Sequence, residues 1–224
     1  MKKAVCVLLL LLAALSSGCG YVNIRTGEGG DRVEGSGNRK TERREVAQFD
    51  RLLVEGAYRV EFVAGSAPGV EVEADDNLLP LIRTDVEGGR LRVHSDRGTT
   101  TKTLPRLRIT AADVREIELP GASQFTLSGV RNESLRISVP GASRLRAEGE
   151  TGRLEVELAG AGLIDAEALR ARQVEASCSG AGSITVYASE SLDATVSGVG
   201  VVNYAGNPPH VNSNVSGLGK VSKK

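Results

Sequence analysis

Apolar and polar residues alternate in short runs through most of this chain, and clusters of turn-forming residues separate the runs. Val60 and Phe62 belong to one run, which residues 65–69 (Gly-Ser-Ala-Pro-Gly) bring to an end. Alternation with a period of two places every second side chain on one face of a strand, and such a cluster predicts a turn. No long window after the N-terminal segment keeps helical spacing, so the pattern predicts an all-β protein.

The second half of the chain carries an internal repeat, marked by the tripeptide Gly-(Ala/Val/Leu)-(Ser/Gly). The tripeptide recurs every 18 to 20 residues, at Gly121, Gly141, Gly160, Gly180, Gly198 and Gly217. Two positions before these glycines stand Leu119, Val139, Leu158, Cys178, Val196 and Val215. Four positions after them stand Phe125, Leu145, Ile164, Ile184, Val202 and Val221. Gly56 has a similar frame, and we interpret it as the turn of a degenerate first coil.

This repeat predicts a right-handed parallel β-helix, a β-solenoid of two-strand coils of about 19 residues each. One coil has two strands with one apolar face each and cannot close a core alone, whereas stacked coils join these faces into continuous columns. Glycine is expected at each turn because the corner needs a positive φ or leaves no room for a Cβ.

A left-handed hexapeptide helix is the alternative, since three hexads make one coil of 18 residues. That fold needs an aliphatic residue at every sixth position around the coil. Leu119 and Phe125 satisfy the rule but Arg131 does not, and Leu158 and Ile164 satisfy it but Arg170 does not. The wandering repeat length also argues against it.

The N-terminus has the organisation of a secretory signal, with Lys2 and Lys3 before an apolar run at residues 4–15. Residues 16–19 read Ser-Ser-Gly-Cys and are similar to a bacterial lipobox, although Ser16 stands where an aliphatic residue is usual. The resemblance implies cleavage after residue 18 and lipidation of Cys19. An ordinary secretory signal followed by a chance cysteine is the alternative.

The expected domain organisation follows from these segments. Residues 1–18 form the lipoprotein signal peptide, and the Gly- and charge-rich residues 19–45 form a flexible tether. Residues 46–224 form the β-helix, with irregular strands and hairpins at residues 46–113 and regular repeats at residues 114–224. Residue 20 is Gly rather than the Asp that retains many lipoproteins at the inner membrane, so we expect a lipid-anchored protein of the cell envelope, at the outer membrane.

Residues 35–224 resemble the head GIN domain family, whose members are described as putative auto-transporter adhesins of bacterial envelopes. The resemblance rests on an ordered set of motifs: Gly-Ser-Gly at 35–37, Arg-Glu-Val at 44–46 leading to Phe49-Asp50, the segment 54–62, Ser-Gly-x-Gly at Gly180, Gly198 and Gly217, and Tyr-Ala-Gly-Asn-Pro at 204–208. The early repeats depart from it, with Pro-Gly-Ala-Ser at 120–123 and 140–143. The family implies a right-handed parallel β-helix without a catalytic set.

Candidate catalytic residues are few. Cys178 occupies a column otherwise filled by Leu and Val, which favours a buried thiol over a nucleophile or redox centre. With Cys6 removed and Cys19 lipidated, no intramolecular disulfide can form. His94 and His210 lack metal-ligand spacing, and no serine nucleophile motif or phosphate loop is present. The sequence therefore predicts no cofactor, no metal and no enzymatic activity.

Outward positions before the repeat glycines suggest one candidate site. Glu155, Glu157, Glu175 and Asp193 would stack into an acidic patch on one sheet face. Such carboxylates could bind Ca²⁺ or act as acid and base in a carbohydrate-active β-helix, such as a polysaccharide lyase or hydrolase. A solvated face that keeps the solenoid soluble is the simpler interpretation. The absence of Trp argues further against sugar cleavage.

The expected function is therefore that of a non-catalytic envelope lipoprotein, anchored by lipid, which presents its β-helix to an envelope or host-surface ligand, either glycan or protein. A structural spacer or homo-oligomer is a further hypothesis. The chain has 28 basic and 28 acidic residues, and no basic stripe with interleaved aromatics. This composition predicts no nucleic-acid partner and gives no sign of another polyanion.

Overall fold

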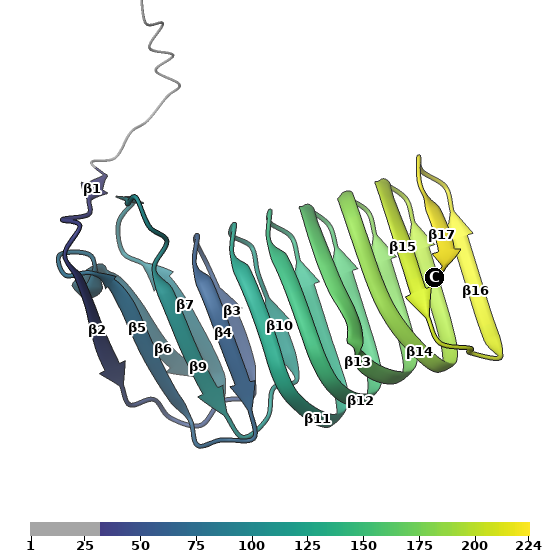
Figure 1. The fold of residues 1–224 in the computed structure, drawn as a ribbon, viewed down its shortest axis with the longest axis horizontal. Coiled ribbons are helices and arrows are strands. Elements are labelled where there is room, and N and C mark those ends of the chain that lie inside the picture. The colour runs from purple at the N-terminus through teal and green to yellow at the C-terminus, as the bar shows by residue number, and fades with distance from the viewer. Residues whose placement is uncertain (1–31) are drawn as a thin grey trace, which may run out of the picture.

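The computed structural model describes residues 32–224. The expected signal peptide and Cys19 lie outside the described residues. The described chain is a parallel β-solenoid of about five turns, drawn as an elongated column in Figure 1. This confirms the predicted fold class.

Long parallel strands form the regular part of the column. They are β10 (Glu116–Glu118), β11 (Gln124–Val139), β12 (Arg144–Leu158), β13 (Ala161–Cys178), β14 (Ala181–Val196), β15 (Val199–Ala205), β16 (His210–Val215) and β17 (Lys220–Lys223). Each strand from β11 to β14 pairs in parallel with the next, so the chain advances by one coil per repeat.

Each coil crosses two sheet faces. The first face contains the stretch that follows each repeat glycine, and the second face contains the stretch that precedes the next glycine. In β11 and β12 the two stretches join at a bend where the register shifts, close to Gly129 (φ 77°) and Gly149 (φ 135°). The two strands expected per coil are therefore one bent strand, because the bend disturbs the ladder without ending it.

Inward side chains form the continuous columns that the repeat predicts. On the second face Val139, Leu158, Cys178 and Val196 lie in register, and each is 0% exposed. On the first face the column is Phe125, Leu145, Ile164, Ile184 and Val202. Burial of each large apolar side chain contributes about 1.5–3 kcal/mol relative to exposure, so these columns supply most of the driving force for stacking.

The turn glycines are needed because neighbouring coils approach too closely for a Cβ. A Cβ on Gly160 would lie 1.9 Å from the carbonyl oxygen of Gly141, and one on Gly180 would lie 1.9 Å from that of Gly160. The same carbonyls accept hydrogen bonds from the next coil, for example from Ala161 N–H to Gly141 at 3.0 Å. The repeat glycines do not have positive φ, unlike Gly56 (φ 116°). Of the two reasons expected for glycine, the lack of space is the one that applies.

The Gly56 coil lies in register with the repeats but is not the outermost coil. It consists of β3 (Arg51–Val54) on the second face and β4 (Arg59–Ala64) on the first. β3 lies between β7 (Arg90–Ser95) and β10, and β4 lies between β9 (Arg106–Ala111) and β11. The chain thus builds this coil, doubles back to form β7 and β9 outside it, and then returns to start the repeats.

Antiparallel strands close the N-terminal end of the column. β5 (Gly69–Asp75) pairs with β9, and β6 (Ile82–Glu87) pairs with β7. A single 3₁₀ turn, η1 (Leu79–Leu81), precedes β6, and β1 (Val33–Glu34) pairs with β8 (Thr99–Thr100). Leu78, Leu79 and Ile82 are buried there and cover the end of the core.

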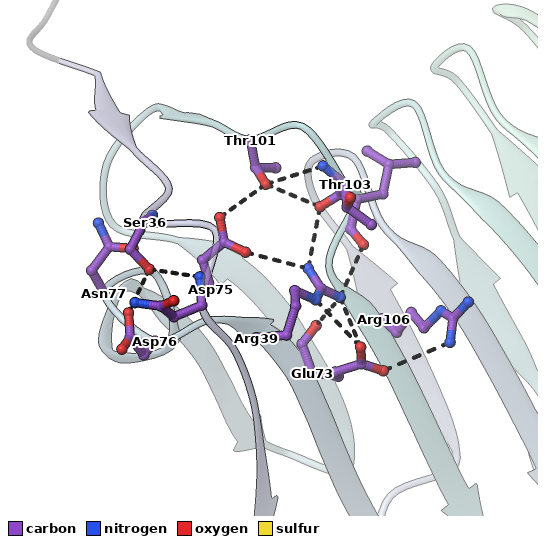
Figure 2. A network of polar contacts seen from close by, with 11 residues as sticks. Ser36, Arg39, Glu73, Asp75, Asp76, Asn77, Thr101, Thr103 and Arg106 are labelled. Atoms are coloured by element: carbon purple, nitrogen blue, oxygen red, sulfur yellow. Dashed lines mark hydrogen bonds and ion pairs between the residues drawn. The ribbon is translucent and has the colours of Figure 1, made fainter.

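The expected tether to residue 45 is wrong in its last part, because β2 (Arg39–Arg44) pairs antiparallel with β5. Figure 2 shows the polar network that holds it. Arg39 donates to the Glu73 carboxylate at 3.2 Å and to the Thr103 carbonyl at 3.3 Å, and it lies 3.7 Å from the buried Asp75. The folded part therefore begins at least seven residues earlier than expected.

The C-terminal end has no comparable cover among residues 32–224. β16 and β17 each pair on one side only, with β14 and β15 respectively, and every residue of β16 is exposed. The exposed large apolar side chains of the described chain gather here, apart from Leu163: they are Val199, Val211, Val215 and Leu218.

The glycine contacts give a first prediction. Gly160→Ala should lower the unfolding free energy by about 3 kcal/mol, because its Cβ meets backbone that a side-chain rotation cannot move. Gly98→Ala is the matched control, since its Cβ would meet only the flexible Arg32 side chain. Urea denaturation followed by circular dichroism measures both. Equal midpoints for the two variants would contradict the close-approach account.

Candidate functional site

Cys178 is part of the core. Its side chain is 0% exposed, between Leu158 and Val196 in the second-face column, and it is a free thiol. Burial raises the pKa of the Cys178 thiol, which disfavours the thiolate that nucleophilic or redox chemistry needs. The location therefore matches the packing interpretation.

The two histidines lie far apart in the fold. His94 is half-buried on β7, 3.7 Å from Asp96 and 3.9 Å from Asp85, whereas His210 begins the exposed β16. Within residues 32–224, no group of three or more His, Cys, Asp or Glu side chains could hold a metal ion. No helix in the same range is long and apolar enough to cross a membrane.

The four carboxylates of the expected acidic patch stack as the repeat predicts. Glu155 of β12 lies beside Glu175 of β13, which lies beside Asp193 of β14. Arginines of neighbouring coils neutralise three of the four. Arg136 pairs with Glu155, and with Glu157 at 3.2 Å, and Arg153 pairs with Glu175 at 2.8 Å. The patch is a ladder of ion pairs on the second face, not an open cluster of carboxylates.

This pairing continues along the second face toward the N-terminal end. Arg90 lies 2.6 Å from Glu116 and 3.9 Å from Glu118, and Arg92 lies 2.8 Å from Glu55. Exposed ion pairs of this kind contribute about 0–1 kcal/mol each, so their main effect is on the surface potential. Arginines and carboxylates are therefore paired along most of the second face.

The first face has a different charge distribution. Two outward columns follow the repeat glycines and continue onto β4 and β9 at the N-terminal end. One column is Arg106, Arg59, Gln124, Arg144, Leu163, Ser183 and Val201. The other is Arg108, Glu61, Thr126, Arg146, Asp165, Thr185 and Asn203. Five arginines therefore lie on three of four neighbouring strands, on β9, β4 and β12, while β11 contributes only Gln124 and Thr126.

Four of these arginines lack an acidic partner. In the described chain, only Arg106 of the five has a carboxylate within 4.0 Å, that of Glu73 at 3.8 Å. Figure 2 shows that Arg39 also pairs with Glu73, so two arginines share this one carboxylate. We call Arg59, Arg108, Arg144 and Arg146 the arginine cluster; all four are exposed.

A hollow of about 470 Å³ lies at one end of the arginine cluster. Its lining includes Arg59 and Arg108, together with Glu61, Glu71 and Thr126. Glu71 is paired with Arg43 at 2.9 Å. Sequence reasoning missed this face because it considered only the outward positions before each glycine, and because the chain as a whole has no net charge. Summing charges over the positions three and five after each glycine would have revealed Arg59, Arg144 and Arg146.

The fold has counterparts among solved structures. A crystal structure described as a putative adhesin from Bacteroides fragilis NCTC 9343 is 23% identical, with a TM-score of 0.72, and covers 86% of this chain and 100% of its own. Another, described as a putative adhesin from Parabacteroides merdae ATCC 43184, is 20% identical, with a TM-score of 0.53, and covers 87% of this chain and 100% of its own. Identities this low show the fold alone. No curated protein matches the chain.

The family assignment rests on the sequence itself. Residues 48–208 match one family, and this match spans the Gly56 coil, the strands from β5 to β9 at the N-terminal end and all the repeats up to β15. The match covers well over half of the chain, and the family is the one that the motifs indicated. The protein belongs to the family described as "Putative auto-transporter adhesin, head GIN domain".

Proposed function

We propose that this protein is a non-catalytic, lipid-anchored protein of the cell envelope that uses the outward faces of its solenoid to bind a surface ligand, a glycan or a protein. The observation that carries the proposal is the alternation of buried and outward side chains along each strand. Inward side chains pack in the core columns, and outward side chains form two exposed faces along the solenoid. The adhesin-like family supports a role at the cell surface.

The paired carboxylates argue against the alternative of a carbohydrate-active enzyme. A glycosidase needs one carboxyl group that holds a proton and another that is free to act as base or nucleophile. Arg136 contacts both Glu155 and Glu157, so each of these carboxylates has a charged partner. Three of the four carboxylates of this ladder are held in ion pairs, so contact rather than cleavage is the proposed activity.

The proposed anchor is the acylated Cys19. Several acyl chains at one site give stable membrane attachment where a single chain would not. The outer membrane is the proposed location, because residue 20 is Gly rather than Asp.

A binding screen tests the proposed activity. The lipid-free full-length protein (Cys19→Ser) should bind at least one envelope polymer or host-surface material without releasing cleavage products. Glu155→Gln and Glu157→Gln should change neither result, since these residues form ion pairs and not a reaction centre. Hydrolysis of a glycan that either substitution abolishes would contradict the proposal and support the enzyme.

Fractionation of cells tests the anchor. Cys19→Ser should move the protein from the membrane to the soluble fraction, whereas Cys178→Ser should leave it in the membrane, because Cys178 is buried in the core. Density-gradient separation should place the wild-type protein in the outer membrane. Retention of Cys19→Ser in the membrane fraction would show that attachment does not depend on this lipidation.

Self-association is a second candidate role, which the exposed C-terminal end favours. A second copy fits β16, because antiparallel pairing around Ser213 places Val211 opposite Val215 and Asn212 opposite Asn214 of the other copy. β16 also carries no Lys, Arg, Asp or Glu that would repel its copy. Sedimentation velocity of the Cys19→Ser protein should show dimers that Val211→Asn disrupts. A clean monomer at micromolar concentration would contradict this role.

A further inference from the structure

We infer that the arginine cluster on the first face binds an acidic polysaccharide through its carboxylate or sulfate groups. This inference rests on the proposed function and narrows it to one face and one class of ligand.

The arginines of the two faces differ in their pairing with carboxylates. On the second face Arg90, Arg92, Arg136 and Arg153 all lie within 4.0 Å of a carboxylate. On the first face the arginine cluster has no such partner within the described chain. The same fold, with the same spacing between strands, thus pairs these arginines on one face and leaves the four of the arginine cluster without an ion pair on the other, although Arg108 lies beside Glu61 and Glu71 in the strand register.

Proximity within the cluster is the second step. Arg144 and Arg146 lie on the same side of β12, two residues apart. Arg59 lies two strands from Arg144, about 10 Å away at the usual strand spacing, and Arg106 stands directly beside Arg59. Like charges at these distances repel each other. A ligand that brings negative charge relieves the repulsion, and so gains binding energy that a neutral ligand does not.

Side-chain chemistry is the third step. A guanidinium group offers a planar fork of donors that matches carboxylate and sulfate oxygens, whereas neutral side chains can bond sugar hydroxyls. Gln124 and Thr126 of β11 lie between Arg59 and Arg144 and between Glu61 and Arg146, respectively. Further along, Ser183, Thr185 and Asn203 continue the two columns with neutral polar groups. A linear polysaccharide lying across the strands would meet arginines first and hydroxyl and amide groups beyond them.

Acidic side chains on the same face separate a polysaccharide from an anionic membrane. Glu61 lies beside Arg108, and Asp165 lies beside Arg146, so a continuous anionic surface pressed against the face would meet repulsion as well as attraction. Leu163 is the one large apolar side chain that is notably exposed on β4, β9 and β11–β13. A flexible chain can place its charged groups at the arginines alone. Nucleic acid is disfavoured because the cluster has no aromatic ring on which a base could stack.

The test compares two double variants in the lipid-free full-length protein (Cys19→Ser). Arg144→Gln/Arg146→Gln removes two charges from the first face, and Arg136→Gln/Arg153→Gln removes two from the second face. Binding is measured to immobilised polygalacturonate and dextran sulfate, with neutral dextran and phosphatidylglycerol vesicles as further probes. Circular dichroism confirms that each variant is folded.

The wild-type protein should bind one or both acidic polymers and not neutral dextran, and the two polymers distinguish carboxylate from sulfate recognition. The first-face variant should lose about tenfold or more in affinity. The slope of its log affinity against log salt concentration should decrease in magnitude by about two, one for each lost contact. The second-face variant should bind within about twofold of wild type.

Three outcomes would overturn the inference: no binding to either acidic polymer, equal losses in both variants, or binding to vesicles alone. The failure of the inference is distinguishable from that of the proposed function. If the protein still adheres to other surface material and the first-face variant adheres equally well, the adhesin role stands without the acidic ligand. If it adheres to nothing, the proposed function itself fails.

Discussion

The approach of backbone to backbone at the glycine turns is the contact on which the structure depends. Each coil lies so close to the last that a carbonyl oxygen occupies the place of the glycine Cβ, while the adjoining N–H groups bond the same carbonyls. This contact recurs once in every repeat, and it keeps successive coils in one register. A slip of one residue would turn every apolar side chain outward, so the register is fixed by both the turns and the core.

The surface follows from the same register. Residues that are distant in the sequence, such as Arg136 and Glu155, become neighbours because they occupy adjoining places in stacked coils. On the second face this proximity pairs most arginines with carboxylates, whereas on the first face the four arginines of the arginine cluster have no ion pair within the described chain. Two faces of one solenoid therefore differ in what they can contact, although both rest on the same core. The proposed adhesive role needs no moving part and no reactive group.

The regular coils could be predicted from the sequence because each repeat has the same pattern of a turn glycine with alternating apolar residues on both sides. The N-terminal end could not. β2 has the sequence Arg-Lys-Thr-Glu-Arg-Arg, with no apolar residue, and it pairs through its backbone and through Arg39 rather than through a buried face. The sequence did not predict the position of β7 and β9 outside the Gly56 coil, for a different reason. The strands that neighbour this coil come later in the chain, and they do not share the repeat spacing.

The candidate site was predictable only in part. The stacking of Glu155, Glu175 and Asp193 follows directly from the repeat. The neutralisation of Glu155 and Glu175 depends on Arg136 and Arg153, which reach across to the neighbouring coil. The net charge of the chain did not reveal the arginine cluster, because an unequal distribution of basic and acidic residues between the two faces leaves the net charge unchanged. Charge has to be summed along stacked columns, and these are known only once the register is known.

The alignment of the arginine-bearing column is the claim that most needs a direct measurement. Spin labels at Glu61→Cys and Asn203→Cys, in a protein without its other cysteines, would mark two positions of the column that contains Arg108 and Arg146. These positions are separated by five strand steps, which predicts a narrow distance distribution centred on about 24 Å by double electron–electron resonance. A broad distribution, or one centred far from this value, would contradict the stacked register and the charged face built on it.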